Sequence, residues 1–78
     1  MRSTMTFALF DAARLTEPCD GWGVDGDDMV RYEAGTIGAV IVLSPTGAEL
    51  ELIGPDGYTY GFVNARFEQI ERLEPRPV

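Results

Sequence analysis

The side chains that most often carry catalysis are scarce in this sequence. It has no histidine, which removes the commonest general base and metal ligand. Cys19 is the one cysteine, and because the chain has no histidine, no imidazole can activate its thiol. Carboxylates occur in pairs at Asp27–Asp28 and at Glu49 and Glu51, but such acids are usually solvated. We therefore expect a protein that is not an enzyme.

Four aspartates form an oxygen-rich group in a short stretch of sequence: Asp20, Asp25, Asp27 and Asp28. Hard cations such as Ca²⁺ take about six to eight oxygen ligands, and an acidic loop can supply some of them. The spacing does not match the known calcium-binding loop with its alternating acids and terminal glutamate. We expect a solvated loop without metal or cofactor, and a weak cation site is the alternative.

Trp22 is the residue best suited to contact a partner, because it lies between Gly21 and Gly23 in this acidic stretch. A large aromatic side chain there either folds back over the core as a plug or is presented to a partner, and the sequence leaves both open. Tyrosines near an acidic loop also match the composition of grooves that bind proline-rich peptides. The candidate partner-binding residues are Trp22, Asp20, Asp25, Asp27, Asp28, Tyr32, Glu49, Glu51 and Tyr58.

The charge of the chain limits which partners it can bind. Its 78 residues include 13 acidic and 6 basic side chains, for a formal net charge of −7. Nucleic-acid binders cluster their basic residues, whereas these arginines are scattered, so direct binding to nucleic acid or to a membrane is not expected. An acidic exterior suits a basic protein partner. The longest apolar run, 39–43, is too short to cross a bilayer, and a lone cysteine forms no internal disulfide, so we expect a cytoplasmic protein.

Length and patterning predict a single all-β domain over residues 1–78. Residues 16–29 combine three glycines, a proline and four aspartates without periodicity, which predicts a long loop. Residues 1–5 and 75–78 are predicted to be frayed. About five short antiparallel strands joined by glycine and proline turns favour a small closed barrel, because closure removes exposed strand edges.

Individual segments can be assigned from their alternation and turn signals. Leu50 and Leu52 alternate with Glu49 and Glu51, which predicts a strand with one solvated face. Residues 7–15 fit a short helix and a buried strand almost equally, and we favour the strand. The other predicted strands are 29–32 as a short edge, 36–43 as a central strand, 48–53, 58–63 with Phe62 and one tyrosine facing the core, and 70–73, with a helical turn at 64–69. The predicted core is Leu9, Ala12, Leu15, Val30, Ile37, Val40, Val42, Leu50, Leu52, Phe62, Val63, Ile70 and Leu73.

The order of these segments resembles the DUF4926 family of small bacterial proteins. The similarity spans residues 7–74, through FDAARLTE, EAGTIGAVIVL, ELELIGPDGYTYGFV and FEQIERL. More loosely, it is similar to KOW modules and to the barrel of nitrile hydratase β subunits. The resemblance implies an SH3-like barrel and no particular activity. Gly35 and Gly38 bracket a strand start, where a barrel needs residues that permit a sharp bend.

The sequence thus predicts a non-catalytic protein-interaction module, such as an accessory, immunity or inhibitor protein, whose acidic surface binds a basic protein. Two alternatives stay open. One is a phage-type inhibitor that imitates nucleic-acid phosphates, and the other is a structural subunit similar to the nitrile hydratase β barrel. The edge segment 29–32 could also pair two copies into a homodimer.

Overall fold

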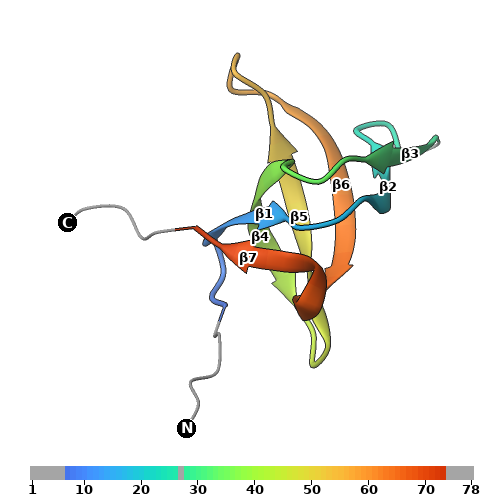
Figure 1. Cartoon of the computed structure of the whole chain (residues 1–78). Coiled ribbons are helices and arrows are strands. Elements are labelled where there is room, and N and C mark those ends of the chain that lie inside the picture. Colours follow the sequence, from blue (N-terminus) through green and yellow to red (C-terminus); the bar gives the residue numbers. More distant parts are fainter. Residues whose placement is uncertain (1–6, 27, 74–78) are drawn as a thin grey trace, which may run out of the picture.

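The computed structural model describes residues 7–26 and 28–73, and these form an all-β protein, as predicted (Figure 1). The predicted frayed ends, 1–5 and 75–78, lie outside the described residues. The strands are β1 (Ala12–Leu15), β2 (Cys19–Gly23), β3 (Met29–Tyr32), β4 (Ile37–Leu43), β5 (Gly47–Ile53), β6 (Thr59–Arg66) and β7 (Ile70–Arg72). A single 3₁₀ turn, η1 (Phe67–Gln69), precedes β7 within the predicted segment 64–69.

All seven strands belong to one antiparallel sheet in the order β3-β2-β6-β5-β4-β1-β7. The prediction of about five strands was too low, and the predicted 16–29 loop is wrong over Cys19–Gly23. That segment pairs with β3 on one side and β6 on the other. Its glycines and aspartate have low strand propensity, but ladder hydrogen bonds on both sides outweigh a weak local preference. The segment 29–32 is the edge strand that its sequence predicts.

The sheet is strongly bent, and small residues allow neighbouring backbones to approach at the bends (Figure 1). A Cβ atom at Gly38 would lie 2.8 Å from the backbone oxygen of Glu51, and one at Gly21 would collide with the backbone carbonyl of Phe62. Gly35, in the turn before β4, has a φ of +96°, a conformation that side chains rarely adopt. Gly35 thus has the positive φ, and Gly38 the close approach of another backbone, that glycine permits at these positions, while their role at a barrel bend stays a prediction.

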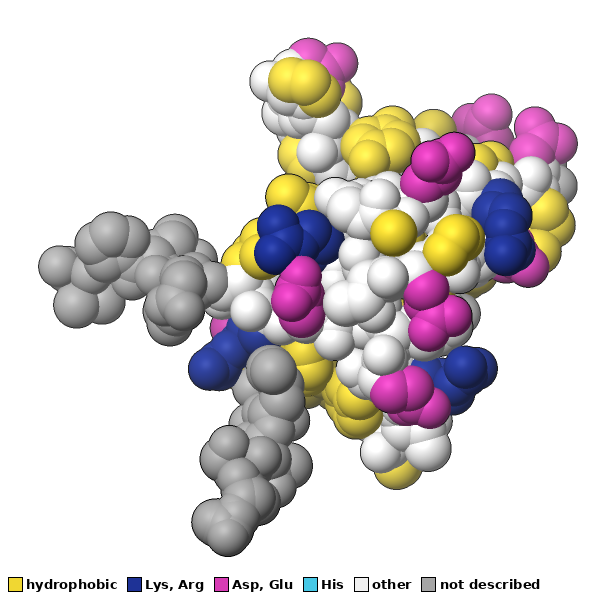
Figure 2. Space-filling view, in the orientation of Figure 1, with side chains coloured by type: hydrophobic (Ala, Val, Ile, Leu, Met, Phe, Trp, Pro, Cys, Tyr) yellow, Lys and Arg dark blue, Asp and Glu magenta, His cyan; other side chains and the backbone are white. Residues whose placement is uncertain are grey.

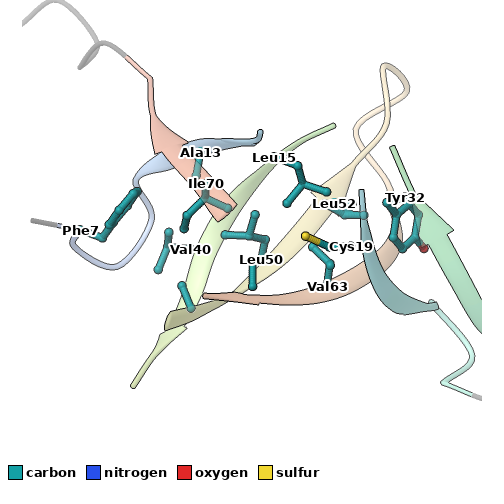
Figure 3. Packing of buried hydrophobic residues seen from close by; sticks show 12 residues of the cluster. Phe7, Ala13, Leu15, Cys19, Tyr32, Val40, Leu50, Leu52, Val63 and Ile70 are labelled. Atoms are coloured by element: carbon teal, nitrogen blue, oxygen red, sulfur yellow. The ribbon is translucent and has the colours of Figure 1, made fainter. Parts of the chain in front are cut away.

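The inner side of the bent sheet holds one hydrophobic cluster to which all seven strands contribute (Figure 3). Its fully buried large side chains are Leu15, Val40, Leu50, Leu52 and Val63. Ile70 also lies in the cluster, at 5% exposure. These six were all predicted as core, because each occupies the apolar side of an alternating strand. Phe7 closes one end of the cluster and stacks on Phe67 with 5.5 Å between the ring centroids.

Several other core predictions were wrong. Leu9, Ala12, Ile37 and Val42 are exposed, and Phe62 is only half-buried. Val42 has the parity of Val40, but the register shifts between these two residues, and a bulge turns the following side chain outward. In β6 the buried side is formed by Gly61, Val63 and Ala65, so the aromatic side chains that alternate with them face away from the core.

The first predicted strand is shorter than expected. Residues 8–11 form a turn in which the Asp11 N–H donates to the Ala8 carbonyl oxygen at 3.1 Å, and β1 begins only at Ala12. Phe10 has a φ of +72° in this turn and is exposed. The predicted turn at Asp56–Gly57 is confirmed, with Gly57 at a φ of +87° and its N–H donating to Gly54.

Candidate protein-interaction surface

Strand register places four of the predicted contact residues on one face of the sheet, although they are distant in the sequence. Residues two apart on a strand point to the same side, so Asp20 and Trp22 share a face of β2, and Glu49 and Glu51 share a face of β5. Trp22 pairs with Phe62, and Phe62 pairs with Glu51. The alternate residues Gly21, Leu50 and Val63 are buried. The outer face of β2, β6 and β5 therefore carries all four.

Trp22 does not fold back over the core as a plug, which was one of the two alternatives left open by its sequence, and its presentation to a partner stays a prediction. It is half-buried within β2, opposite Met29 on β3 and Phe62 on β6, and it is not part of a loop. One side of the indole therefore contacts the sheet, while the remainder is available at the surface. Asp20, on the same strand face, accepts a hydrogen bond from Arg31 at 2.9 Å, and both side chains are exposed.

Two described aspartates, Asp25 and Asp28, lie in the β2–β3 hairpin, which adjoins β2. Asp25 and Asp28 are exposed, and Asp27 lies outside the described residues. The hairpin and the β5–β6 turn are at the same end of the β2–β6 pair, because these strands run antiparallel. Figure 2 shows acidic and hydrophobic side chains over both segments, with hydrophobic side chains between them. Tyr58, next to the β5–β6 turn, is 76% exposed.

Tyr32 departs from the rest of the predicted set, because it is buried and cannot contact a partner in this structure. Its hydroxyl donates to the backbone oxygen of Trp22 at 3.0 Å, and its ring lies edge-on to Tyr60. Burial raises the pKa of Tyr32, and Tyr60 adds to the shift. The side chain thus closes the β3 end of the core (Figure 3).

Glu49 and Glu51 look equivalent in the sequence but differ in their surroundings. The Glu51 carboxylate accepts a hydrogen bond of 2.5 Å from the Thr59 hydroxyl. Glu49 lies opposite Asn64 on β6, and its half-buried carboxylate has no hydrogen bond or ion pair with another side chain among the described residues. Of the two, Glu49 is the acceptor that is open to a ligand.

A pocket of about 240 Å³ lies next to Glu49, where the β4–β5 turn approaches the end of β6. Its lining is formed by Val42, Ser44, Thr46, Gly47, Ala48, Glu49, Asn64, Ala65, Arg66 and Gln69. Sequence reasoning identified Glu49 but missed Asn64 and Arg66, because it ended the strand at Val63. The alternation of Phe62 and Asn64 with buried Val63 was the available signal, and the missing information was the true length of β6.

Three of the described arginines pair with carboxylates at the surface. Arg14 lies 2.7 Å from Glu71, Arg31 lies 2.9 Å from Asp20, and Arg66 lies 3.1 Å from Glu68. Figure 2 shows dark blue side chains lying beside magenta ones. With 13 acidic residues against 6 arginines, most carboxylates have no such partner available. Exposed pairs of this kind contribute little stability.

The chemistry of the remaining polar groups is limited. The Cys19 thiol is buried and contacts the Glu17 carbonyl oxygen at 3.5 Å. Burial raises the pKa of this thiol and the Glu17 carboxylate raises it further, which disfavours the reactive thiolate. Within residues 7–26 and 28–73, no three metal-ligating side chains come together. The described part of the chain also contains no helix with the length and apolarity needed to span a membrane.

Comparison with protein-family models, with curated proteins and with solved structures found no match to this chain.

Proposed function

We propose that this chain is a non-catalytic protein-interaction module that binds a basic protein partner through the outer face of β2, β6 and β5. The observation that carries the proposal is the strand register, which brings Trp22 together with the carboxylates of Glu49 and Glu51. Large aromatic side chains supply much of the affinity at protein interfaces. Carboxylates around such an aromatic residue favour a basic partner and speed its association.

The exposed apolar side chains near this face support the same proposal. Met29 is 75% exposed and lies opposite Trp22 on the edge strand, and Tyr58 is as exposed at the β5–β6 turn. Single exposed apolar residues are common, but a group of them bordered by charged residues is typical of an interaction site. Asp25 and Asp28 supply this charged border in the hairpin.

The groups that could act in catalysis also favour a binding role. The one cysteine is buried with a raised pKa, and the chain has no histidine. The pocket beside Glu49 holds one carboxylate and one arginine, and that arginine is paired with Glu68. Such a set lacks the paired general acid and general base that acid–base catalysis uses.

The proposal is tested by capturing partners from a lysate of the encoding organism with the full chain, followed by affinity measurements on the purified partner. We expect a partner with a basic surface, and we expect its affinity to fall about tenfold or more between roughly 50 and 300 mM NaCl, because salt screens exposed charges. Asp25→Asn should weaken binding by about threefold, whereas Glu17→Gln, an equal charge change away from the outer face, should have a smaller effect.

Two results would contradict this proposal: binding that does not depend on salt, or equal effects of Asp25→Asn and Glu17→Gln. If the partner is a nucleic-acid-binding protein and short oligonucleotides displace this chain, the acidic face imitates phosphates, as the first sequence alternative holds.

We also propose a relationship to SH3-like barrels, which is supported by the strongly bent sheet and by η1 immediately before the last strand. The open edge of β3 leaves pairing of two copies a prediction.

A further inference from the structure

We propose that the pocket beside Glu49 receives one arginine side chain of the partner, held by the Glu49 carboxylate and the Asn64 side chain. This inference rests on the proposed function and names the chemistry of one contact within it. It is based on which polar groups around the pocket already have hydrogen-bond or ion-pair partners within the chain, and on the size of the pocket.

Three of the polar side chains that line the pocket, those of Ser44, Arg66 and Gln69, already have a partner within the chain. The Ser44 hydroxyl donates to the Gly47 carbonyl oxygen at 3.2 Å and accepts from the Gly47 N–H at 3.1 Å. The Gln69 side-chain oxygen accepts from the backbone N–H of Arg66 at 2.9 Å. These groups shape the pocket wall, but their main hydrogen-bonding capacity is already used.

Arg66 gives the pocket one positive charge, but Glu68 offsets it. The Arg66 guanidinium lies 3.1 Å from the Glu68 carboxylate. A backbone hydrogen bond and this guanidinium hold the pKa of Glu68 below its usual range, so that carboxylate is charged at neutral pH. The charge left without a counterion at the pocket is therefore the carboxylate of Glu49.

Glu49 and Asn64 face each other across the β5–β6 pair and provide adjacent acceptors. Neither side chain has a hydrogen bond or ion pair to another group in the part of the chain that is described. A guanidinium presents five N–H donors in a planar fork and binds carboxylates in a bidentate manner. The Glu49 carboxylate can accept two of these donors and the Asn64 amide oxygen a third. A lysine ammonium would also be attracted to the Glu49 carboxylate, but it lacks the planar fork of donors that matches a carboxylate.

The volume of the pocket also fits a single side chain. At about 240 Å³ it is smaller than the usual sites for drug-sized ligands, which span about 300–1,000 Å³. Val42 and Ala48 contribute apolar lining against which the methylene groups of an arginine can pack. The pocket opens near the outer face that carries Trp22, so one partner could occupy both.

The test is a titration of the ¹⁵N-labelled full chain with N-acetyl-arginine methylamide, followed by NMR. We expect chemical-shift changes centred on Glu49 and Asn64, and an affinity about tenfold weaker in Glu49→Gln. Glu51→Gln is the matched control, since it removes the same charge two residues along the same strand face, where Thr59 already occupies the carboxylate. Glu51→Gln should weaken binding of the arginine probe less than Glu49→Gln does, because the Thr59 hydroxyl already bonds the Glu51 carboxylate.

One further variant and two further probes complete the test. Asn64→Asp should tighten binding of the arginine probe, because it adds a carboxylate opposite Glu49. N-acetyl-lysine methylamide should bind more weakly than the arginine probe, and N-acetyl-glutamate methylamide should leave the pocket resonances unchanged. Unchanged melting temperatures would establish that both glutamine variants are folded.

If Glu49→Gln and Glu51→Gln weaken binding of the arginine probe equally, the proposed arginine site is wrong. The probe is then attracted only by the general charge of the acidic surface. Shift changes that avoid Glu49 and Asn64, or an equal response to the acidic probe, would also overturn the proposed site. Failure of the pocket can be distinguished from failure of the proposed function. If only the pocket fails, the purified partner still binds in a salt-dependent manner, and Glu49→Gln weakens that binding no more than Asp25→Asn does. If the proposed function fails, no basic partner binds, whatever the arginine probe does.

Discussion

At the residue scale, equal side chains have unequal roles because their neighbours differ. Glu49 and Glu51 occupy the same face of one strand, but the Thr59 hydroxyl binds only Glu51. Two tyrosines predicted at a partner-binding surface separate in the same way. Tyr58 is 76% exposed, whereas Tyr32 is buried with its hydroxyl bonded to the backbone of β2. Residue type alone therefore did not determine which side chain reaches solvent.

The buried tyrosine leads to a prediction about alkaline pH. Burial raises the pKa of Tyr32 above its ordinary value of 10.0. The unfolded chain then loses this proton at a lower pH than the folded chain does. The stabilisation is complete below about pH 10 and is lost as the pH rises through the higher folded pKa. Chemical denaturation between about pH 8 and 11 should show this fall in the free energy of unfolding.

Tyr32→Phe is the control for this prediction, because it removes the ionisable hydroxyl but retains the ring. It should lower stability by about 1 kcal/mol at neutral pH, since the Trp22 carbonyl oxygen loses its donor. It should also flatten the alkaline loss of stability relative to wild type. An equally steep decline in both proteins would assign that loss to other groups, such as the buried Cys19 thiol.

At the element scale, β2 is the segment whose structure depends most on its neighbours. It was predicted as part of a loop because glycine and aspartate are poor strand formers. In the fold it is paired on both sides, by β3 and by β6. Its two glycines differ in the space around them. Gly21 lies against the backbone of β6 at close range, whereas Gly23 has open space where a Cβ atom would be.

These two glycines form a matched pair for mutation. A Cβ at Gly21 would lie 2.9 Å from the Val63 Cα atom and closer still to the Phe62 carbonyl oxygen. Gly21→Ala should therefore destabilise the fold by about 1–3 kcal/mol or more, as overpacking does. Gly23→Ala should change the free energy of unfolding by less than about 1 kcal/mol. Equal effects in urea denaturation would show that β2 does not pack against β6 at this distance.

At the scale of the whole molecule, two electrostatic effects oppose each other. Three arginine–carboxylate pairs are attractive, but all lie at the surface, where such pairs contribute little to stability. The remaining carboxylates give the chain its net charge of −7, and their mutual repulsion destabilises the compact state. Because this repulsion involves more charges than the pairs do, we infer that it is the larger effect.

This inference predicts that salt stabilises the protein at neutral pH. Raising NaCl from about 10 to 300 mM shortens the screening length from roughly 30 Å to below 10 Å, which weakens repulsion between distant carboxylates more than attraction within close pairs. Stabilisation by about 1 kcal/mol would raise the melting temperature by about 4–8 °C in a domain of this size. Calorimetry measures this directly, and a melting temperature that falls with added salt would mean that the ion pairs dominate.

The sequence determined the all-β class, the alternation of β5 and the buried positions Leu15, Val40, Leu52 and Val63, because strand period and side-chain polarity are local properties. It also determined the acidic charge of the surface, the edge position of β3 and the turn at Asp56–Gly57. These features follow from residues that lie next to one another along the chain.

Only the tertiary structure decided which distant residues meet. It made β2 a strand, turned Val42 outward at a bulge and placed Asn64 opposite Glu49. It also put Trp22 on the same face as Glu51 and left Glu49 beside an open pocket. Each of these outcomes depends on pairing register, and register is set by hydrogen bonds and packing between strands that no local pattern encodes.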